Sequence, residues 1–255
     1  MVNCSFYKDA KTYQNNLQLK DDASFSEHIS FVRSYIPAAA KILDVGCGAG
    51  QTVKLLQQNG YDTVGCDLYA GGISGLGKIA CGDGGCLPFG DGAFDAVVSC
   101  DYLEHVPNPG QALSEMARVT APGGLVLIHS PNLLSPIHPL KAIFCYRPLY
   151  RRQGIPFDSP FGKTAASLGL TAVKNLGRLC RKNMSPTYRF NSRTPDYKRP
   201  EIGDMDASWW CNPVDIKRWI QEKGHQMICY QQKGRTRLLG SLASGIQIVF
   251  KKLKQ

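Results

Sequence analysis

A glycine-rich turn between a short apolar run and a helical pattern is the feature that most limits how this chain can fold. Residues 41–45 read KILDV, an apolar run that contains one acid, Asp44. Residues 51–58 carry apolar side chains at helical spacing, and between the two segments three glycines stand at alternate positions: Gly46, Gly48 and Gly50. Glycine lets the backbone turn sharply and lets a ligand approach it closely. The pattern predicts a strand, a ligand-binding turn and a helix, and its G-x-G-x-G spacing differs from the G-x-G-x-x-G that binds a pyrophosphate.

Acidic residues follow at the ends of the next two predicted strands. Residues 61–67 predict a second strand that ends in Asp67, at the distance past the glycines where an acid accepts hydrogen bonds from ribose hydroxyls. Asp83 follows at a third predicted strand end, where a carboxylate can accept a hydrogen bond from the amino group of an adenine. In an open parallel sheet the ligand lies at the carboxyl ends of the strands, so we expect these acids to converge on one site.

The order of the remaining patterns favours an α/β fold with a doubly wound, mostly parallel sheet. Residues 93–100 and 125–130 are apolar runs typical of strands, and residues 111–120 between them have helical spacing. Strands that alternate with helices through short loops indicate repeated βαβ units.

Five sequence stretches resemble the class I S-adenosylmethionine-dependent methyltransferases, in the broad group that includes ubiquinone and menaquinone biosynthesis enzymes. The resemblance covers roughly residues 35–131, and the stretches read, in family order, LDVGCGAG, VGCDL, GDGGCLPFGDGAFDAVVS, YLEHVPNPGQALSEMARVTAPGG and LVLIHSPN. The resemblance implies a Rossmann-like methyltransferase fold with a seven-stranded sheet, completed by a helix over 214–223 and an antiparallel strand pair over 225–231 and 245–251. It also implies S-adenosylmethionine as the cofactor, released as S-adenosylhomocysteine.

The resemblance identifies candidate residues for binding this cofactor. They are Asp44, Gly46, Cys47, Gly48, Gly50, Asp67, Leu68, Asp83, Gly84 and Cys100. Simpler interpretations stay open for several of them: the glycines would serve only the turn, Asp44 would be a structural cap, Asp67 a turn residue and Asp83 a solvated acid.

Residues 101–105, which follow the fourth predicted strand, supply the candidate for catalysis. A hydroxyl acceptor needs a base with a pKa near neutrality, and His105 at the mouth of the expected site is the first candidate; alternatively, His105 orients the loop beside Glu104. We expect an enzyme of biosynthetic metabolism that methylates a hydroxyl group of an anionic small molecule. Methylation of nitrogen or carbon, methylation of RNA and a non-catalytic cofactor-binding scaffold are the alternatives.

We expect no metal site. Asp101, Glu104 and His105, with His138 as a further ligand, echo a metal-binding pattern of some relatives, but LEHV is also common in relatives that use no metal. The ten cysteines are scattered without C-x-x-C pairs, which favours reduced thiols in a cytoplasmic protein over disulfides or a zinc site.

The charge of the chain changes sharply after the fifth predicted strand. The net charge is +10, but residues 41–140 hold 4 basic and 9 acidic residues, whereas residues 141–200 hold 13 basic and 2 acidic. We divide the chain into an N-terminal helical cap (1–40), a cofactor-binding core (41–131), a basic acceptor-binding insert or lid (132–208) and a C-terminal part (209–255). The candidates for acceptor binding in the insert are His138, Arg147, Arg151 and Arg152, because arginine binds planar anions bidentately.

The basic insert also leaves other partners open. Aromatic residues stand among its cations, which fits contact with a membrane surface, and positive charge fits nucleic acid. We expect a small-molecule acceptor rather than nucleic acid, because the chain lacks the Asn/Asp-Pro-Pro-aromatic motif of base amino methylation. The sequence indicates no oligomeric state.

Overall fold

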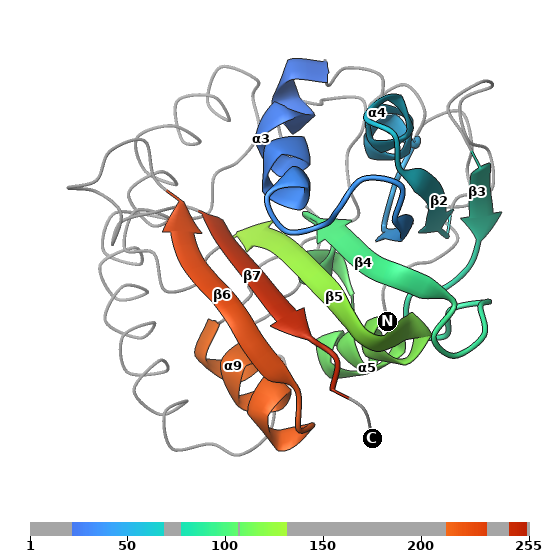
Figure 1. Ribbon diagram of the computed structural model, residues 1–255. Helices are drawn as coiled ribbons and strands as arrows, with labels where there is room; N and C mark the ends of the chain where they lie inside the picture. Colours follow the sequence, from blue (N-terminus) through green and yellow to red (C-terminus); the bar gives the residue numbers. More distant parts are fainter. Residues whose placement is uncertain (1–21, 69–77, 107, 132–212, 234–244, 254–255) are drawn as a thin grey trace, which may run out of the picture.

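One seven-stranded sheet organises the chain (Figure 1). The computed structural model describes residues 22–68, 78–106, 108–131, 213–233 and 245–253. The strands of the sheet are β1 (Lys41–Val45), β2 (Asp62–Asp67), β3 (Lys78–Cys81), β4 (Phe94–Cys100), β5 (Thr120–Pro131), β6 (Gln226–Lys233) and β7 (Gly245–Lys251). The helices are α3 (Asp22–Arg33), α4 (Gln51–Gln58), α5 (Pro109–Val119) and α9 (Pro213–Glu222), with a short 3₁₀ turn, η1 (Leu103–His105).

The strand order confirms the predicted doubly wound sheet. The order is β3-β2-β1-β4-β5-β7-β6, in which β1 to β5 run parallel and β7 is antiparallel to both of its neighbours. The chain winds outward from β1 toward β3 and then returns to β4 on the other side of β1. This reversal makes the carboxyl ends of β1 and β4 the place where such a sheet opens to a ligand.

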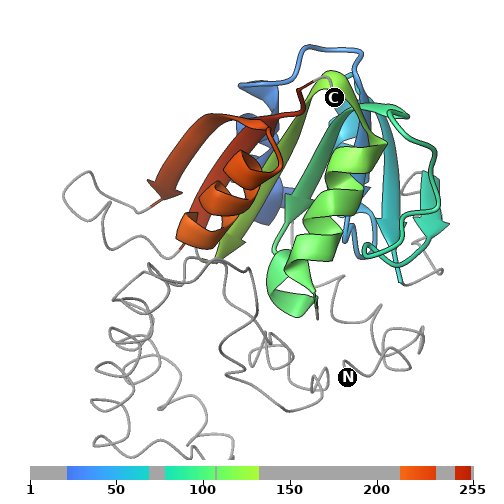
Figure 2. The ribbon, with the colours of Figure 1, turned by 90° about the horizontal axis from the view of Figure 1, so that it is seen from below.

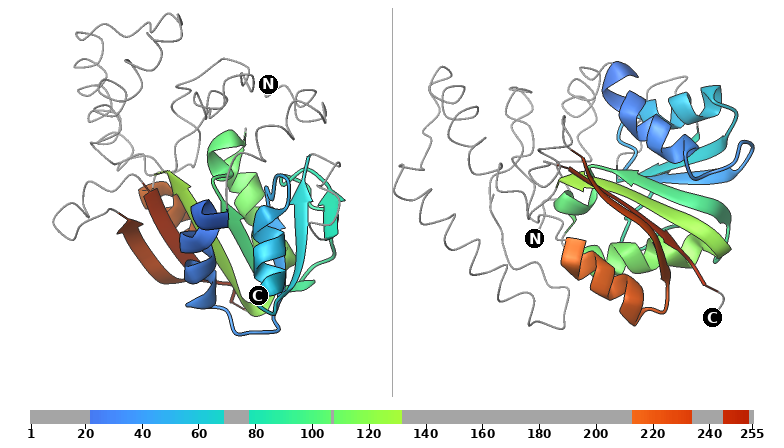
Figure 3. Two further views of the ribbon diagram at one scale, coloured as in Figure 1. Left: turned by 90° about the horizontal axis from the view of Figure 1, so that it is seen from above. Right: turned by 60° about the vertical axis from the view of Figure 1, so that its left-hand side comes forward.

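The helices cover both faces of the sheet. In Figure 3, α3 and α4 lie on one face, and in Figure 2, α5 and α9 lie across the other. Successive strand residues point to opposite faces, so Ile42 packs in the core with α3 and α4 whereas Leu43 packs in the core with α5 and α9. Continuous apolar runs in the central strands reflect burial on both sides.

Most predicted elements occur where expected, with shifts at their ends. Residues 51–58 and 245–251 have the predicted bounds. The helix expected from residue 111 begins at Pro109, because Asn108 Oδ1 accepts a hydrogen bond from the Gln111 amide at 3.2 Å and caps it. The third strand ends at Cys81, so Asp83 lies in the following turn.

Part of the predicted organisation lies outside the described residues. This holds for the basic insert over 132–208 and for its candidate acceptor residues, His138, Arg147, Arg151 and Arg152. Over the ranges that the structure describes, no helix is both long enough and apolar enough to span a membrane.

Candidate functional site

The glycine loop follows β1 and requires glycine for its backbone. Gly46, Gly48 and Gly50 have φ angles of +76°, +54° and +90°, which side-chain-bearing residues rarely adopt. The Gly46 amide donates to the Cys66 carbonyl at 2.8 Å, and Gly50 is the N-cap of α4. The loop therefore joins the carboxyl end of β1 to the amino end of a helix, whose backbone N–H groups favour bound anionic or polar groups.

Asp67, at the end of β2, holds this loop. Its Oδ2 accepts a hydrogen bond from the Gly48 amide at 2.8 Å. Asp67 thus stabilises the turn, which is one of the two interpretations that the sequence left open. The hydrogen bond from a ribose hydroxyl to Asp67 stays a prediction.

Asp44 is a buried acid beneath the loop. Only 2% of the residue is exposed, and its Oδ2 has no hydrogen-bond partner among the described residues. Burial and, to a lesser degree, the nearby charge of Asp67 raise the pKa of Asp44 from 3.8 to about 7. Asp44 therefore keeps its proton to a higher pH than an ordinary aspartate. Its carboxyl group can accept a hydrogen bond from a ligand or, when protonated, donate one.

Tyr102 is a residue of this site that the sequence patterns missed. A Cβ built on Gly46 would lie 2.6 Å from Tyr102 Cγ, and one built on Gly84 would lie 2.8 Å from Tyr102 Cζ. The ring thus lies between the glycine loop and the turn of Asp83. Burial, with the charges of Asp83 and Asp67, raises the Tyr102 pKa well above its usual range, so its hydroxyl keeps its proton. Asp101, just before it, has a φ angle of +49°, an uncommon conformation for a residue with a side chain.

Three further cofactor candidates, Asp83, Gly84 and Leu68, lie just past the carboxyl ends of β3 and β2. Asp83 is exposed, and its Oδ1 accepts a hydrogen bond from the Gly85 amide at 2.8 Å. Gly84 is buried under the Tyr102 ring, and Leu68 is half-buried just past β2. The exposed position of Asp83 fits both interpretations from the sequence, a solvated acid and an acid that binds the adenine.

Glu104 and His105 lie beyond the carboxyl end of β4. Glu104 is 1% exposed and its Oε2 accepts a hydrogen bond from Ser130 Oγ at 3.1 Å. His105 Nε2 lies 4.0 Å from Glu104 Oε1, and 23% of the His105 side chain is exposed. An accessible imidazole beside a buried carboxylate fits both interpretations of His105, as a base and as a loop-orienting residue.

The two cysteine candidates differ in their surroundings. Cys47 is buried in the glycine loop, and burial followed by the charges of Asp44 and Asp67 raises its pKa well above the ordinary value. Cys100 ends β4 and is half-buried, with its Sγ 3.7 Å from His129 Nδ1 on β5. No disulfide joins the six cysteines that lie within the described ranges.

Comparison with known proteins shows which family the sheet and its glycine loop resemble. Residues 43–128 match the family described as methyltransferase domain. The chain carries a class I S-adenosylmethionine-dependent methyltransferase domain. The cofactor of this family is S-adenosylmethionine, as the sequence predicted.

Two curated relatives and one solved structure illustrate the likeness. An uncharacterized methyltransferase of Mycobacterium sp. (strain KMS) is 35% identical over 39% of this chain and 42% of its own length. A demethylmenaquinone methyltransferase of Mycobacterium bovis is 42% identical over 34% of this chain and 39% of its own length. The chain thus spans about two fifths of the length of these two curated relatives.

The solved structure extends the likeness of the fold over most of the chain. It is the 1,6-didemethyltoxoflavin-N1-methyltransferase of Burkholderia thailandensis, solved with 1,6-didemethyltoxoflavin and S-adenosylhomocysteine bound. Its TM-score is 0.55 at 12% identity, over 95% of this chain and 84% of that protein. At this identity the likeness supports the fold.

The methyltransferase domain offers features that suit its cofactor. The three glycines of the loop, which carry no side chains, form a tight turn after β1, and Asp44 brings a buried carboxyl oxygen without a partner in the described part of the chain. The structure brings together Asp44, the glycine loop, Asp67 and Tyr102. Asp83 lies next to this group, because the Tyr102 ring contacts the following residue, Gly84.

Proposed function

We propose that this protein transfers the methyl group of S-adenosylmethionine to a small-molecule acceptor, with a hydroxyl group as the methylated position. The observation that carries the proposal is the glycine loop after β1, whose backbone conformation is rare for residues with a side chain and which Asp67 ties to the end of β2. The loop lies where the sheet of a methyltransferase domain opens.

Different residues of the chain would bind different parts of the cofactor. The glycine loop, with Cys47 and the amino end of α4, would receive the amino-acid part, and Asp67 with Leu68 the ribose. Asp83 and Gly84 would bind the adenine next to Tyr102, whose ring contacts Gly84, and Cys100 would contribute from the end of β4. When bound, S-adenosylmethionine supplies an electrophilic methyl group, so the protein's remaining tasks are to orient the acceptor and remove its proton.

His105 is the proposed base. A neutral imidazole nitrogen would take the hydroxyl proton as the new oxygen–carbon bond forms, and the resulting imidazolium would lie beside the Glu104 carboxylate, 4.0 Å away. Such a neighbour stabilises the charge that develops on the ring. The same arrangement supports transfer to a nitrogen that must lose a proton, as in a small-molecule N-methyltransferase.

The proposed acceptor is a small anionic molecule. A curated relative named demethylmenaquinone methyltransferase and a structural neighbour named 1,6-didemethyltoxoflavin-N1-methyltransferase support small-molecule acceptors over RNA. The excess of basic residues over 141–200 supports an anionic one, with His138, Arg147, Arg151 and Arg152 as proposed contacts. Replacement of Arg151 and Arg152 by alanine should then raise the KM for the acceptor more than the KM for the cofactor.

Calorimetric titration with S-adenosylmethionine and S-adenosylhomocysteine, with NADH as the control ligand, tests the cofactor. We expect micromolar binding of the first two and none of NADH. Asp67→Ala should weaken binding sharply, whereas Asp62→Ala, an exposed acid at the other end of β2, should not. No binding by the wild-type protein would contradict the proposal, and equal affinities of the two variants would remove Asp67 from the site.

Turnover measurements with His105→Ala test the base. Screening hydroxylated anionic metabolites for release of S-adenosylhomocysteine would first supply an acceptor. We then expect kcat to fall about 10²- to 10⁴-fold with unchanged affinity for S-adenosylhomocysteine. An unaffected rate would assign the proton transfer to another group.

A further inference from the structure

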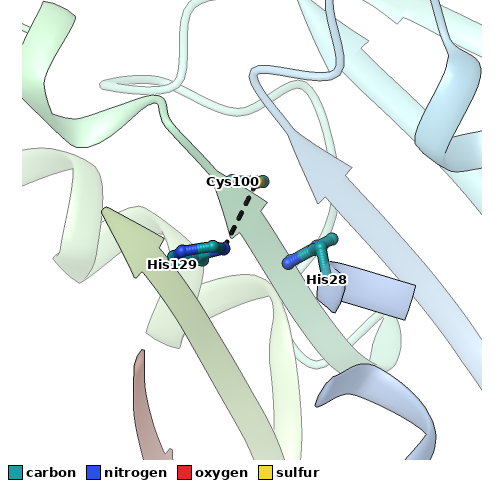
Figure 4. A group of neighbouring side chains, drawn as sticks. All are labelled: His28, Cys100 and His129. Atoms are coloured by element: carbon teal, nitrogen blue, oxygen red, sulfur yellow. Dashed lines mark hydrogen bonds between the residues drawn. The ribbon is translucent and has the colours of Figure 1, made fainter. Parts of the chain in front are cut away.

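Three potential metal ligands meet on the α3 side of the sheet. The proposed function gives none of them a chemical step, and of the three only Cys100 is also a cofactor candidate. His28 comes from α3, Cys100 from the end of β4 and His129 from β5 (Figure 4). One ligand atom from each residue lies within 4.8 Å of the other two. Of the described residues, these three are the ones that gather in this way.

His28 is the unexplained member of this group. It is 2% exposed, and neither of its ring nitrogens has a hydrogen-bond partner among the described residues. A buried polar group without a partner is costly, so native structures usually provide one. The His28 ring instead stacks against the His129 ring, with centroids 6.1 Å apart and an interplanar angle of 22°. Two imidazoles and a thiol thus share one small volume.

We propose that His28, Cys100 and His129 bind a divalent ion of the zinc type, with the fourth position left to water or to a bound molecule. Imidazole and thiolate are the ligands that zinc prefers, and three protein ligands with an open fourth position are typical of zinc sites that act on a molecule. The site rests on these three residues and not on the proposed methyl transfer.

The observed distances suit this ion after a small movement. Tetrahedral zinc with bonds of about 2.0–2.3 Å requires ligand atoms roughly 3.3–3.6 Å apart. Cys100 Sγ and His129 Nδ1, at 3.7 Å, already have this separation. The remaining ligand atom lies within 4.8 Å of the other two, so binding of the ion requires it to approach by roughly an ångström.

The strand register supports a preformed site. Cys100 and His129 are direct partners in the β4–β5 ladder, so two of the three ligands are fixed by sheet hydrogen bonds. The Asp101 amide also donates to the His129 carbonyl at 2.9 Å, which holds the end of β4 against β5. Ligands on rigid elements lose little freedom when the ion binds.

Cobalt titration of the full-length, reduced and chelator-treated protein tests the proposal. We expect a thiolate-to-cobalt charge-transfer band that saturates at one equivalent and disappears when Zn²⁺ displaces Co²⁺. Cys100→Ser should abolish the band, and His28→Asn and His129→Asn should each weaken binding at least about tenfold. Cys86→Ser, which changes an exposed cysteine outside the group, should leave the band unchanged.

Absence of the band, or a band that persists in Cys100→Ser, would overturn the proposal; in the second case the protein binds an adventitious ion only, through other thiols. Alkylation of the unaltered protein gives an answer that does not depend on how the variants fold. Zn²⁺ should slow modification of Cys100, read by peptide mass spectrometry, while Cys86 keeps its rate. Equal rates for Cys100 with and without Zn²⁺ would also overturn the proposal.

Discussion

Asp44 carries a stability cost that depends on pH. Its pKa is about 7 in the folded protein, raised from 3.8 by burial and by Asp67. As pH rises from about 4 to about 7, Asp44 loses its proton in the unfolded chain but keeps it in the folded one, so the free energy of unfolding falls. Above pH 7 this contribution levels off, at a cost on the order of a few kcal/mol.

Asp44→Asn should remove this cost, because asparagine has nearly the same shape and no charge. We expect the ligand-free variant to be more stable than the wild type at pH 8 and equal to it near pH 4, measured by urea denaturation across this range. Asp62→Asn, at an exposed position, is the matched control and should retain the wild-type pH dependence. A wild-type slope in Asp44→Asn would contradict the assignment of the cost to this carboxyl.

Glycine is favoured at positions 46 and 60 for different reasons. Both have positive φ angles, +76° and +86°, but a Cβ on Gly46 would meet the Tyr102 ring whereas one on Gly60 would meet nothing within 4 Å. Gly60→Ala should therefore cost only the backbone strain, about 1–2 kcal/mol. Gly46→Ala should cost more and should also abolish binding of S-adenosylhomocysteine, which Gly60→Ala should retain. Equal losses of stability and binding would show that the Tyr102 contact does not matter.

At the scale of elements, α5 fastens the loop between β3 and β4. Arg118 donates to the Leu87 carbonyl at 3.0 Å, the Phe89 carbonyl at 2.8 Å and Asp91 Oδ1 at 2.7 Å. Arg118 also forms two 2.8 Å hydrogen bonds to Glu115, which in turn accepts from the Leu87 amide at 2.8 Å. One helix thus holds both backbone groups of Leu87, next to the turn of Asp83.

Arg118→Lys should break this clamp while keeping the positive charge. Lysine cannot reproduce the planar fork, so backbone carbonyls lose their donors, and we expect the free energy of unfolding to fall by about 1–3 kcal/mol. Arg33→Lys, on the exposed end of α3, is the control and should have little effect. Similar small changes in both variants would indicate that the clamp adds nothing to stability.

At the scale of the whole molecule, the last strand completes the fold. β7 lies between β5 and β6, and its Ile246, Ile248, Val249 and Phe250 side chains are fully buried. The Phe250 ring stacks on His225 at 5.5 Å and meets Trp219 edge-on at 5.8 Å, which joins the end of the chain to α9. The carboxyl-terminal segment is therefore part of the main core.

Phe250→Ala should lower the free energy of unfolding by about 3–5 kcal/mol, because it removes a large buried ring from a packed core. Leu253→Ala, at a residue 40% exposed just past the same strand, should change it by less than about 0.5 kcal/mol. Urea denaturation of both variants measures the difference. A small effect of Phe250→Ala would show that the antiparallel pair is dispensable for stability.

The sequence by itself determined the order of elements and the place of the glycine loop. Alternation of apolar runs with helical spacing is local, and so are the three glycines and the acids at strand ends. These local patterns predicted α4 with its observed bounds and the glycine loop after β1, and the family resemblance implied β7 with its observed bounds. They were weaker at element ends, as at Asp83, because caps and turns shift those ends by a few residues.

Only the tertiary structure decided which side chains meet across the sheet. Tyr102 lies against Gly46 and Gly84, Arg118 holds Leu87, and His28 joins Cys100 and His129. Each of these groupings joins segments that are far apart in the chain, so no spacing in the sequence encodes it. The physical reason is that strand register and helix packing, which depend on the whole core, set these distances.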